Sequence, residues 1–116
     1  MRILVTISRD WDDYGAIQDA LSEMCQGISY YKVTVIHGAS QMDWFIAGVA
    51  YTFGMDLEAH RADWSKGKFA GFARNQKMVD SGADKCLAFI KDGSHGATDC
   101  ADRAEKAGIP TTRYRA

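Results

Sequence analysis

The chain has 116 residues, and its 47% hydrophobic content can fill one core but hardly two. We therefore expect a single domain over residues 1–116. The 14 basic residues nearly balance the 15 acidic ones, and the net charge of -1 gives no general attraction to nucleic acid or to an anionic membrane. Any anionic ligand must therefore be bound by local groups.

The first residues run directly into a strand-like stretch, without a long apolar segment or a small-residue cleavage site. We expect no signal peptide, no membrane span and a cytoplasmic location. The cysteines form no CxxC pair, so we expect buried thiols rather than a disulfide framework or a zinc module. These are Cys25, Cys86 and Cys100. Each histidine follows a predicted strand, but no HxxH or HxH spacing is present, and we expect neither a metal nor a cofactor.

The first half of the chain alternates strand patterns with helix patterns. Residues 2–7 form a run of Ile, Leu and Val that predicts a strand buried on both faces. A helix follows, with Asp12 or Asp13 as its cap and Gly27 as its stop. Residues 32–36 are a second β-branched run, and Asp43 is the expected cap of a helix that runs through Phe53 to Gly54.

The second half continues the same alternation. Residues 55–61 predict a weaker third strand, and a long polar segment over residues 62–75 precedes a helix that ends near Gly82. Residues 84–90 predict a fourth strand with a glycine-rich exit over residues 91–96. A helix over residues 97–107 and an edge strand over residues 111–114 complete the chain.

This order of elements predicts the fold. Strands and helices alternate, so successive strands are not joined by hairpin turns. The helices are long enough to cross over the sheet, which favours a parallel sheet covered on both faces. We expect an α/β fold, a single Rossmann-like three-layer α/β/α sandwich whose five-stranded parallel sheet has the order 3-2-1-4-5. In such a sheet, ligands bind at the carboxyl ends of the strands, where the strand order reverses between strands one and four.

The two loops at that point are rich in groups that suit an anion. Gly93 and Gly96 permit close approach of the backbone, while Ser94, Thr98 and the first N–H groups of the last helix can donate to a phosphate. A glycine-rich loop alone is a weak signal, and a plain strand-to-helix turn explains it too. Arg9 follows the first strand and can supply a positive charge or form a surface ion pair.

Two tryptophans and the start of the third helix are further candidates. Trp11 and Trp64 can stack on a base or ribose, or can anchor their loops against the domain. Arg74 and Asn75 are expected to open the third helix, where an arginine is disfavoured by the helix dipole and therefore suggests an anionic partner. The chain has no GxSxG, no Walker loop and no GxGxxG after the first strand, so a nucleophile triad and a hydride enzyme are not expected.

Several motifs spread over nearly the whole chain resemble one family. They are the SRDW run at residues 8–11, the VIHGA run at 35–39, the ADW run at 62–64, the segment from Gly71 through Arg74 and Asn75 to Met78, and the GIP run at 108–110. Together they resemble the YspA-type, cpYpsA-related members of the SLOG superfamily. That superfamily also includes the Lonely Guy phosphoribohydrolases and the DNA-processing DprA proteins, and the resemblance implies a Rossmann-like fold that binds nucleotides or nucleotide-derived ligands in bacteria and their phages.

The resemblance also implies a set of pocket residues, which agrees with the crevice expected from the fold. With the candidates above, the expected ligand-binding residues are Ser8, Arg9, Trp11, Gly38, Ala39, Asp43, Trp64, Gly71, Arg74, Asn75, Gly93, Ser94, Gly96 and Thr98. The chain departs from the family pattern after the second strand, where relatives usually read close to HGGARGAD and this chain is one residue shorter without the arginine. Phosphate contacts are therefore expected to be weakened or shifted.

A second departure concerns catalysis. Lonely Guy enzymes have a glutamate after their glycine-threonine pair, and the matching position here is occupied by Cys100. A thiol is a poor substitute for a carboxylate in stabilising an oxocarbenium-like transition state, which favours binding over phosphoribohydrolase activity.

Three functions remain open. The first is a binding module for a nucleotide or nucleotide-derived ligand, acting as a sensor or sequestering its ligand. The second is cleavage of an N-glycosidic bond, with Arg74 positioning phosphate and Asp43 or Asp99 as the acid. The third is a protein-interaction module that uses exposed Trp11, Trp64 and Phe69. A homodimer through the apolar second helix is compatible with the sequence, and so is burial of that helix within one chain.

Overall fold

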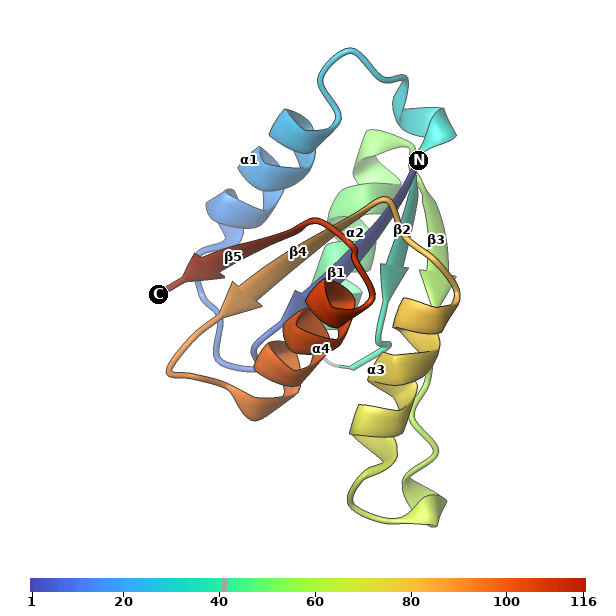
Figure 1. The fold of residues 1–116 in the computed structure, drawn as a ribbon. Coiled ribbons are helices and arrows are strands. Elements are labelled where there is room, and N and C mark those ends of the chain that lie inside the picture. Colours follow the sequence, from blue (N-terminus) through green and yellow to red (C-terminus); the bar gives the residue numbers. More distant parts are fainter. Residues whose placement is uncertain (41) are drawn as a thin grey trace.

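The computed structural model describes residues 1–40 and 42–116, and its centre is a parallel five-stranded sheet. The strands are β1 (Arg2–Ile7), β2 (Thr34–His37), β3 (Asp56–Ala59), β4 (Lys85–Ile90) and β5 (Thr111–Arg115). Their order across the sheet is β3-β2-β1-β4-β5, and every neighbouring pair is parallel (Figure 1). The predicted strand order is confirmed, and the order reverses between β1 and β4.

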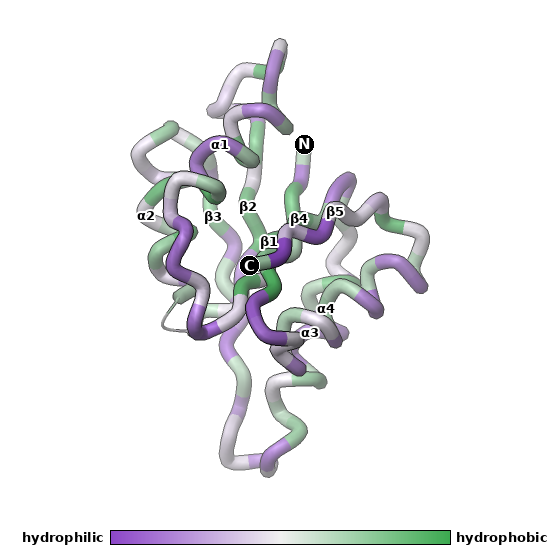
Figure 2. The backbone as a smooth tube through the Cα atoms, turned by 90° about the vertical axis from the view of Figure 1, so that its left-hand side faces the viewer, coloured by the Kyte–Doolittle hydropathy of each residue, from purple (hydrophilic) through white to green (hydrophobic). Residues whose placement is uncertain are grey.

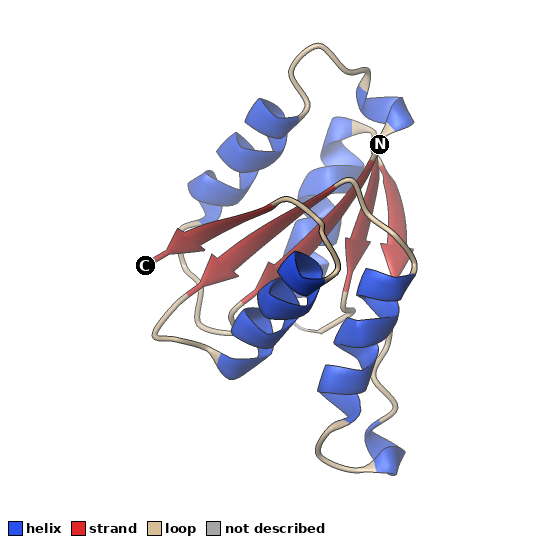
Figure 3. Cartoon of the chain, in the orientation of Figure 1, coloured by secondary structure: helices blue, strands red, loops and turns tan. Residues whose placement is uncertain are grey.

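Four helices cover the two faces of this sheet. The helices α1 (Tyr14–Met24) and α2 (Asp43–Phe53) lie on one face, and α3 (Ala70–Asp80) and α4 (His95–Lys106) lie on the other (Figure 3). Two short 3-10 turns, Tyr30–Lys32 and Trp64–Lys66, join helices to strands. The expected Rossmann-like three-layer sandwich is therefore confirmed.

The central strands are buried on both sides because their side chains alternate between two cores. Ile3, Val5 and Phe89 pack with α1 and α2, whereas Leu4 and Cys86 pack with α3 and α4. This explains why β1 and β4 read as continuous apolar runs rather than as alternating patterns. Figure 2 shows the same distribution, with the hydrophobic segments gathered on the central strands. Cys25, Cys86 and Cys100 are free and buried, as expected.

Capping residues in the sequence predicted two helix ends correctly and one wrongly. Asp13 caps α1 by accepting a hydrogen bond from the Ala16 N–H at 3.1 Å, and Gly54 ends α2 with a φ of 84°, so both predictions are confirmed. The expected cap at Asp43 is wrong, because the helix cap is Met42 and Asp43 is the first helical residue. The Asp43 carboxylate instead accepts a hydrogen bond from the Ser40 N–H at 3.2 Å.

Two helices begin earlier than expected, and this changes how the site is built. Residues 62–75 are not one long loop, since a 3-10 turn and the first turns of α3 lie within them. The last helix, α4, begins at His95 with Ser94 as its cap, so Gly96 belongs to its first turn. Among the described residues, no helix has both the length and the apolar character needed to cross a membrane.

Candidate functional site

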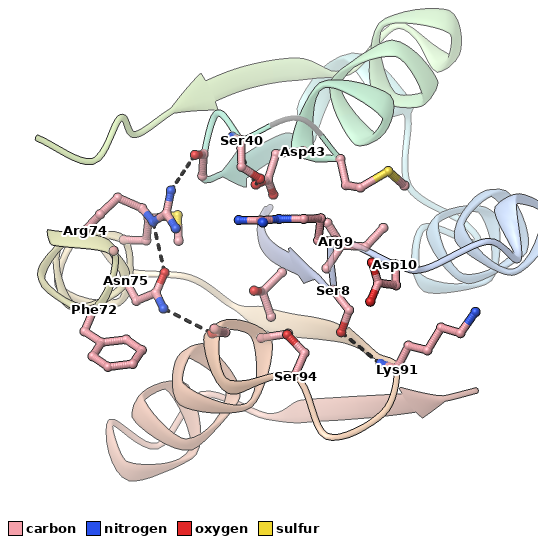
Figure 4. Close-up of a pocket in the computed structure, with 18 of the residues that line it drawn as sticks. Ser8, Arg9, Asp10, Ser40, Asp43, Phe72, Arg74, Asn75, Lys91 and Ser94 are labelled. Atoms are coloured by element: carbon pink, nitrogen blue, oxygen red, sulfur yellow. Dashed lines mark hydrogen bonds between the residues drawn. The ribbon is translucent and has the colours of Figure 1, made fainter. Parts of the chain in front are cut away.

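A cavity of about 680 Å³ opens at the carboxyl ends of β1, β2 and β4. Its walls come from the loop after β1, the β2–α2 loop, the start of α3 with the preceding 3-10 turn, and the β4–α4 loop (Figure 4). The volume lies within the range typical of small-molecule sites, and the position is the one at which open parallel sheets bind ligands. The strand order and the loop lengths thus place one sizeable cavity at the expected edge.

Ten of the fourteen expected site residues line this cavity. They are Ser8, Arg9, Gly38, Asp43, Trp64, Gly71, Arg74, Asn75, Ser94 and Gly96. The other four, Trp11, Ala39, Gly93 and Thr98, do not line it. Ala39 and Gly93 nevertheless have positive φ values of 49° and 64°, so they shape loops whose neighbours do line the cavity.

Trp11 is a packing residue in this structure. Its side chain is only 4% exposed and meets the Phe89 ring edge-on at 5.3 Å, and its indole N–H donates to the Asp13 carbonyl at 2.8 Å. The expectation of an exposed Trp11 on an interaction surface is therefore wrong. An aromatic ring in a loop next to a buried strand gains more from joining the core than from facing water, which is the anchoring alternative raised from the sequence.

Ser8 joins the two loops at the point where the strand order reverses. Its N–H donates to the Phe89 carbonyl at 2.8 Å, and its hydroxyl oxygen accepts from the Lys91 N–H at 2.8 Å. The side chain is 2% exposed, yet it lines the cavity. Because the hydroxyl oxygen accepts from Lys91, its own proton is available to a ligand oxygen.

The start of α4 presents backbone donors to the cavity. The first hydrogen bond of this helix runs from the Thr98 N–H to the Ser94 carbonyl at 3.0 Å, so the N–H groups of residues 95–97 precede the helical ladder. Nothing lies within 4 Å of the position that a Gly96 side chain would occupy. The turn before the helix is closed by a bond from the Ser94 N–H to the Lys91 carbonyl at 3.1 Å. These features form a typical anion-binding helix start.

Arg74 is held by uncharged acceptors. Its Nη1 donates to the Gly38 carbonyl at 2.6 Å and its Nε donates to the Asn75 side-chain oxygen at 3.0 Å. The expected position at the start of α3 is wrong, because the helix begins at Ala70 and Arg74 lies in its second turn. The helix-dipole argument for an anionic partner therefore does not apply to Arg74. The case for such a partner rests on the charge of this arginine, which no described carboxylate pairs with.

Asn75 fastens α3 to α4 beneath the cavity. It is 2% exposed, and its amide nitrogen donates to the Gly96 carbonyl at 3.2 Å and to Asp99 at 3.1 Å. Its oxygen is already used by Arg74. All of its hydrogen-bonding groups therefore have protein partners, and its part in the site is to position Arg74 and the start of α4.

Two glycines make room for side chains that line the cavity. A Cβ atom at Gly38 would lie 2.7 Å from Arg74 Nη1 and 2.9 Å from its Cζ. A Cβ atom at Gly71 would lie 3.1 Å from the Trp64 ring. The Arg74 guanidinium thus lies directly on the backbone of the β2 loop, and the Trp64 indole lies against the first turn of α3.

Two arginine side chains on the cavity wall form no ion pair with the described residues. Arg9 is exposed and points into the cavity, and it makes no ion pair with the described residues (Figure 4). Lys91 pairs with Asp12 at 3.1 Å, and this carboxylate raises the pKa of the lysine. Within the described part of the chain, Arg74 also lacks a carboxylate partner. Arg9 and Arg74 therefore retain charge that a ligand can use.

The candidate acids differ in their access to the cavity. Asp43 lines it and is 6% exposed. Asp99 does not line it and is paired with Arg103 at 2.8 Å. Burial raises the pKa of the Cys100 thiol to about 12, so this thiol remains protonated at neutral pH. At the position of the Lonely Guy glutamate this chain thus has a buried, protonated thiol.

His37 is a buried titratable group at the end of β2. It is fully buried, its Nδ1 accepts from the Ala39 N–H at 3.3 Å, and its Nε2 has no partner among the described residues. Burial lowers the pKa of His37, with a smaller opposing effect from Asp43. No group of three or more His, Cys, Asp and Glu side chains that could hold a metal occurs among the described residues.

Sequence reasoning missed several residues of the cavity wall. They are Thr6, Ile7, Asp10, Ser40, Met42, Lys68, Phe72, Met78, Lys91, Asp92 and Ala97. Asp10, Asp92 and Ala97 lie inside the two loops that were predicted to line the crevice, residues 8–13 and 92–98, so the loops themselves were the available signal. Lys68 and Phe72 lie in the stretch that was read as loop, and an earlier start for α3 would have placed them beside Arg74.

Comparisons with known proteins identify the family of the chain. Residues 1–67 match the model of a family described as "YspA, cpYpsA-related SLOG family". The chain is also 40% identical over 120 residues to a curated relative, "Gene 61 protein" of Mycobacterium phage D29, and the match covers 97% of this chain and 95% of the relative. The matched segment, residues 1–67, supplies about half of the residues that line the cavity, most of them in the loops after β1 and β2.

Proposed function

Since the chain belongs to the YspA, cpYpsA-related SLOG family, we propose that it binds a nucleotide or nucleotide-derived ligand in the cavity at the carboxyl ends of its strands. In this proposal the protein releases its ligand chemically unchanged, as a sensor or a sequestering module does. We place it in the cytoplasm, where nucleotides are abundant and where its buried thiols would stay reduced.

The observation that carries the proposal is the set of uncompensated donors around one cavity. Two guanidinium groups, those of Arg9 and Arg74, lack carboxylate partners among the described residues, and the first N–H groups of α4 lie on the same cavity. Two like charges near each other repel, and an anion bound between them relieves that repulsion. A phosphate suits such a site because it accepts several hydrogen bonds at once.

The α3 side of the cavity supplies an aromatic surface for a base. Trp64 is 64% exposed and lines the cavity together with Phe72, so a flat face of the indole is available for stacking. Stacking on an aromatic side chain contributes about 1–3 kcal/mol per base and tolerates different bases. Phosphate donors at α4 and an aromatic surface beside α3 are the two features that a nucleotide needs.

Binding is favoured over catalysis by the residues at and beside the position of the Lonely Guy glutamate. The Cys100 thiol is protonated at neutral pH and Asp99 is held by Arg103, so neither is free to assist departure of a base. Cleavage of an N-glycosidic bond is retained as a second candidate because of Asp43, whose buried carboxylate lines the cavity. That candidate requires free base to accumulate when the protein is incubated with a nucleotide.

The test is native mass spectrometry of the protein with a mixed pool of nucleotides, cyclic nucleotides and NAD derivatives. Arg9→Gln removes an exposed charge on the cavity, and Arg115→Gln is the matched control because Arg115 is exposed at the end of β5 and does not line the cavity. We expect one intact species to be retained by the wild type and by Arg115→Gln, and retention to fall about tenfold or more in Arg9→Gln.

Other results of this experiment would overturn the proposal in different ways. Conversion of the retained species to free base would replace the binding module by the hydrolase. Retention of no species would move the function to a protein partner, with the exposed side chains of Trp64 and Phe69 as the surface to examine. Equal loss in both arginine variants would indicate general charge attraction rather than a site.

A further inference from the structure

We propose that Asp43 makes this cavity selective for a sugar that keeps its ribose hydroxyl groups, so that ribonucleotides bind in preference to deoxyribonucleotides. The inference rests on the proposed nucleotide-binding function and adds the recognition of the sugar to it. It starts from the buried Asp43 carboxylate, whose Oδ1 accepts no hydrogen bond from the described residues.

Among the described residues, hydrogen bonds reach only one oxygen of the Asp43 carboxylate. The Ser40 N–H donates to Oδ2 at 3.2 Å, and the Ser40 hydroxyl donates to the same oxygen. Oδ1 accepts no hydrogen bond from the described residues. Of the described side-chain atoms that lack a partner, only His37 Nε2 is sealed from both solvent and cavity. Asp43 is 6% exposed and lines the cavity, so its carboxylate can meet a ligand bound there.

A free carboxylate oxygen in such a place selects for a donor. A buried charge without enough hydrogen bonds is costly, and a ligand hydroxyl that donates to it recovers part of that cost. The same oxygen repels a phosphate. Ser40 fixes the carboxylate orientation through two bonds, so the free oxygen is held ready and little ordering is required when a ligand binds.

The surrounding walls indicate which part of a nucleotide meets Asp43. Ser94 and the start of α4 lie across the cavity from Ser40 and Asp43, and Arg74 and Phe72 lie on the α3 side (Figure 4). With phosphate at the α4 start and the base at the aromatic end, the sugar lies between them. The sugar hydroxyls are the donors of that part of the molecule. Of the two remaining walls, the loop after β1 and the β2–α2 loop, the second carries the buried carboxylate of Asp43.

The experiment compares each ribonucleoside monophosphate with its 2′-deoxy and 3′-deoxy counterparts by calorimetry. The variant is Asp43→Asn, in which the Ser40 donors keep the amide oxygen and turn the NH₂ group toward the cavity, where it cannot accept from a hydroxyl. Asp19→Asn is the matched control, because Asp19 is exposed on α1 and does not line the cavity. Thermal melting of each variant confirms that it is folded.

We expect the wild type and Asp19→Asn to bind the ribose form about ten- to a hundredfold more tightly than a deoxy form, and Asp43→Asn to lose this ratio. The ratio is internal to each protein, so a general weakening of the variant does not imitate the result. Equal binding of ribose and deoxy forms by the wild type would overturn the inference and leave the proposed function standing. A ratio that persists in Asp43→Asn, or that changes with the base instead of the sugar, would also overturn it. If no nucleotide binds, both fall together.

Discussion

Gly38→Ala provides a stringent test of the contact between the β2 loop and α3. The φ of Gly38 is not in the left-handed region, so alanine fits the backbone itself. The new Cβ atom would instead lie 2.7 Å from Nη1, 2.9 Å from Cζ and 3.2 Å from Nε of Arg74. The guanidinium must therefore swing away and give up its 2.6 Å bond to the Gly38 carbonyl.

The size of the effect follows from two opposing contributions. A hydrogen bond from a charged donor contributes about 1.5–3 kcal/mol, and the lower value applies here because the Arg74 side chain is only half-buried. Replacing glycine by alanine at a compatible position stabilises by about 0.5 kcal/mol through the unfolded chain. Gly38→Ala should therefore lower the free energy of unfolding by about 1 kcal/mol. In an Arg74→Ala background only the favourable contribution remains, so the same change should raise it by about 0.5 kcal/mol.

The assay is a double-mutant cycle measured by urea unfolding of the wild type, both single variants and the double variant. We expect a coupling free energy of about 1.5 kcal/mol and a change of sign between the two backgrounds. The same cost of Gly38→Ala in both backgrounds would refute the reasoning, because it would show that the added methyl group meets something other than Arg74. An unchanged dependence on urea concentration is the control for the compactness of the unfolded chain.

Two further predictions concern buried polar groups. Asn75→Ala should lower the free energy of unfolding by about 2–3 kcal/mol, because it removes the acceptor of the Arg74 Nε–H and the bonds from the buried amide to Gly96 and Asp99, and urea unfolding measures it. His37 has a pKa below its ordinary 6.5 because it is buried, so the unfolded chain binds its proton first as the pH falls. The stability of the wild type should therefore fall below pH 6.5 more steeply than that of His37→Asn, and parallel pH profiles would contradict this account.

The fold was predictable because each strand carries a local signal and the alternation leaves few topologies. The runs at β1 and β4 are apolar throughout, which is typical of strands buried on two faces. Their order across the sheet follows from the rules for parallel crossovers. The errors lie at the element ends, where β2 begins two residues later than expected because Tyr30–Lys32 forms a 3-10 turn.

The site was predictable to the level of loops and less well to the level of side chains. Ser8, Arg9 and Ser94 were found because any residue that follows a strand at the reversal point reaches the crevice. Arg74 was expected to reach the crevice from the start of a helix, but it lines the cavity from the second turn of α3. Trp11 illustrates the general difficulty, because only the packing of the whole core decides whether a tryptophan in a loop is buried or presented to a ligand.

Distances that depend on tertiary contact were beyond the sequence. The approach of Arg74 to Gly38 joins residues 36 positions apart, and the Asn75 bond to Asp99 joins residues 24 positions apart. No local pattern encodes either contact. The free oxygen of Asp43 is likewise visible only once Ser40 is seen to occupy the other one.

The measurement that tests the central claim most directly is the change in backbone amide resonances when a ribonucleoside monophosphate is added to the protein. The account predicts that the largest shifts fall on residues 8–10 and 93–98, at the loop after β1 and the start of α4, while α1 stays unchanged. Shifts confined to the surface between α1 and α2, or none at saturating nucleotide, would contradict it.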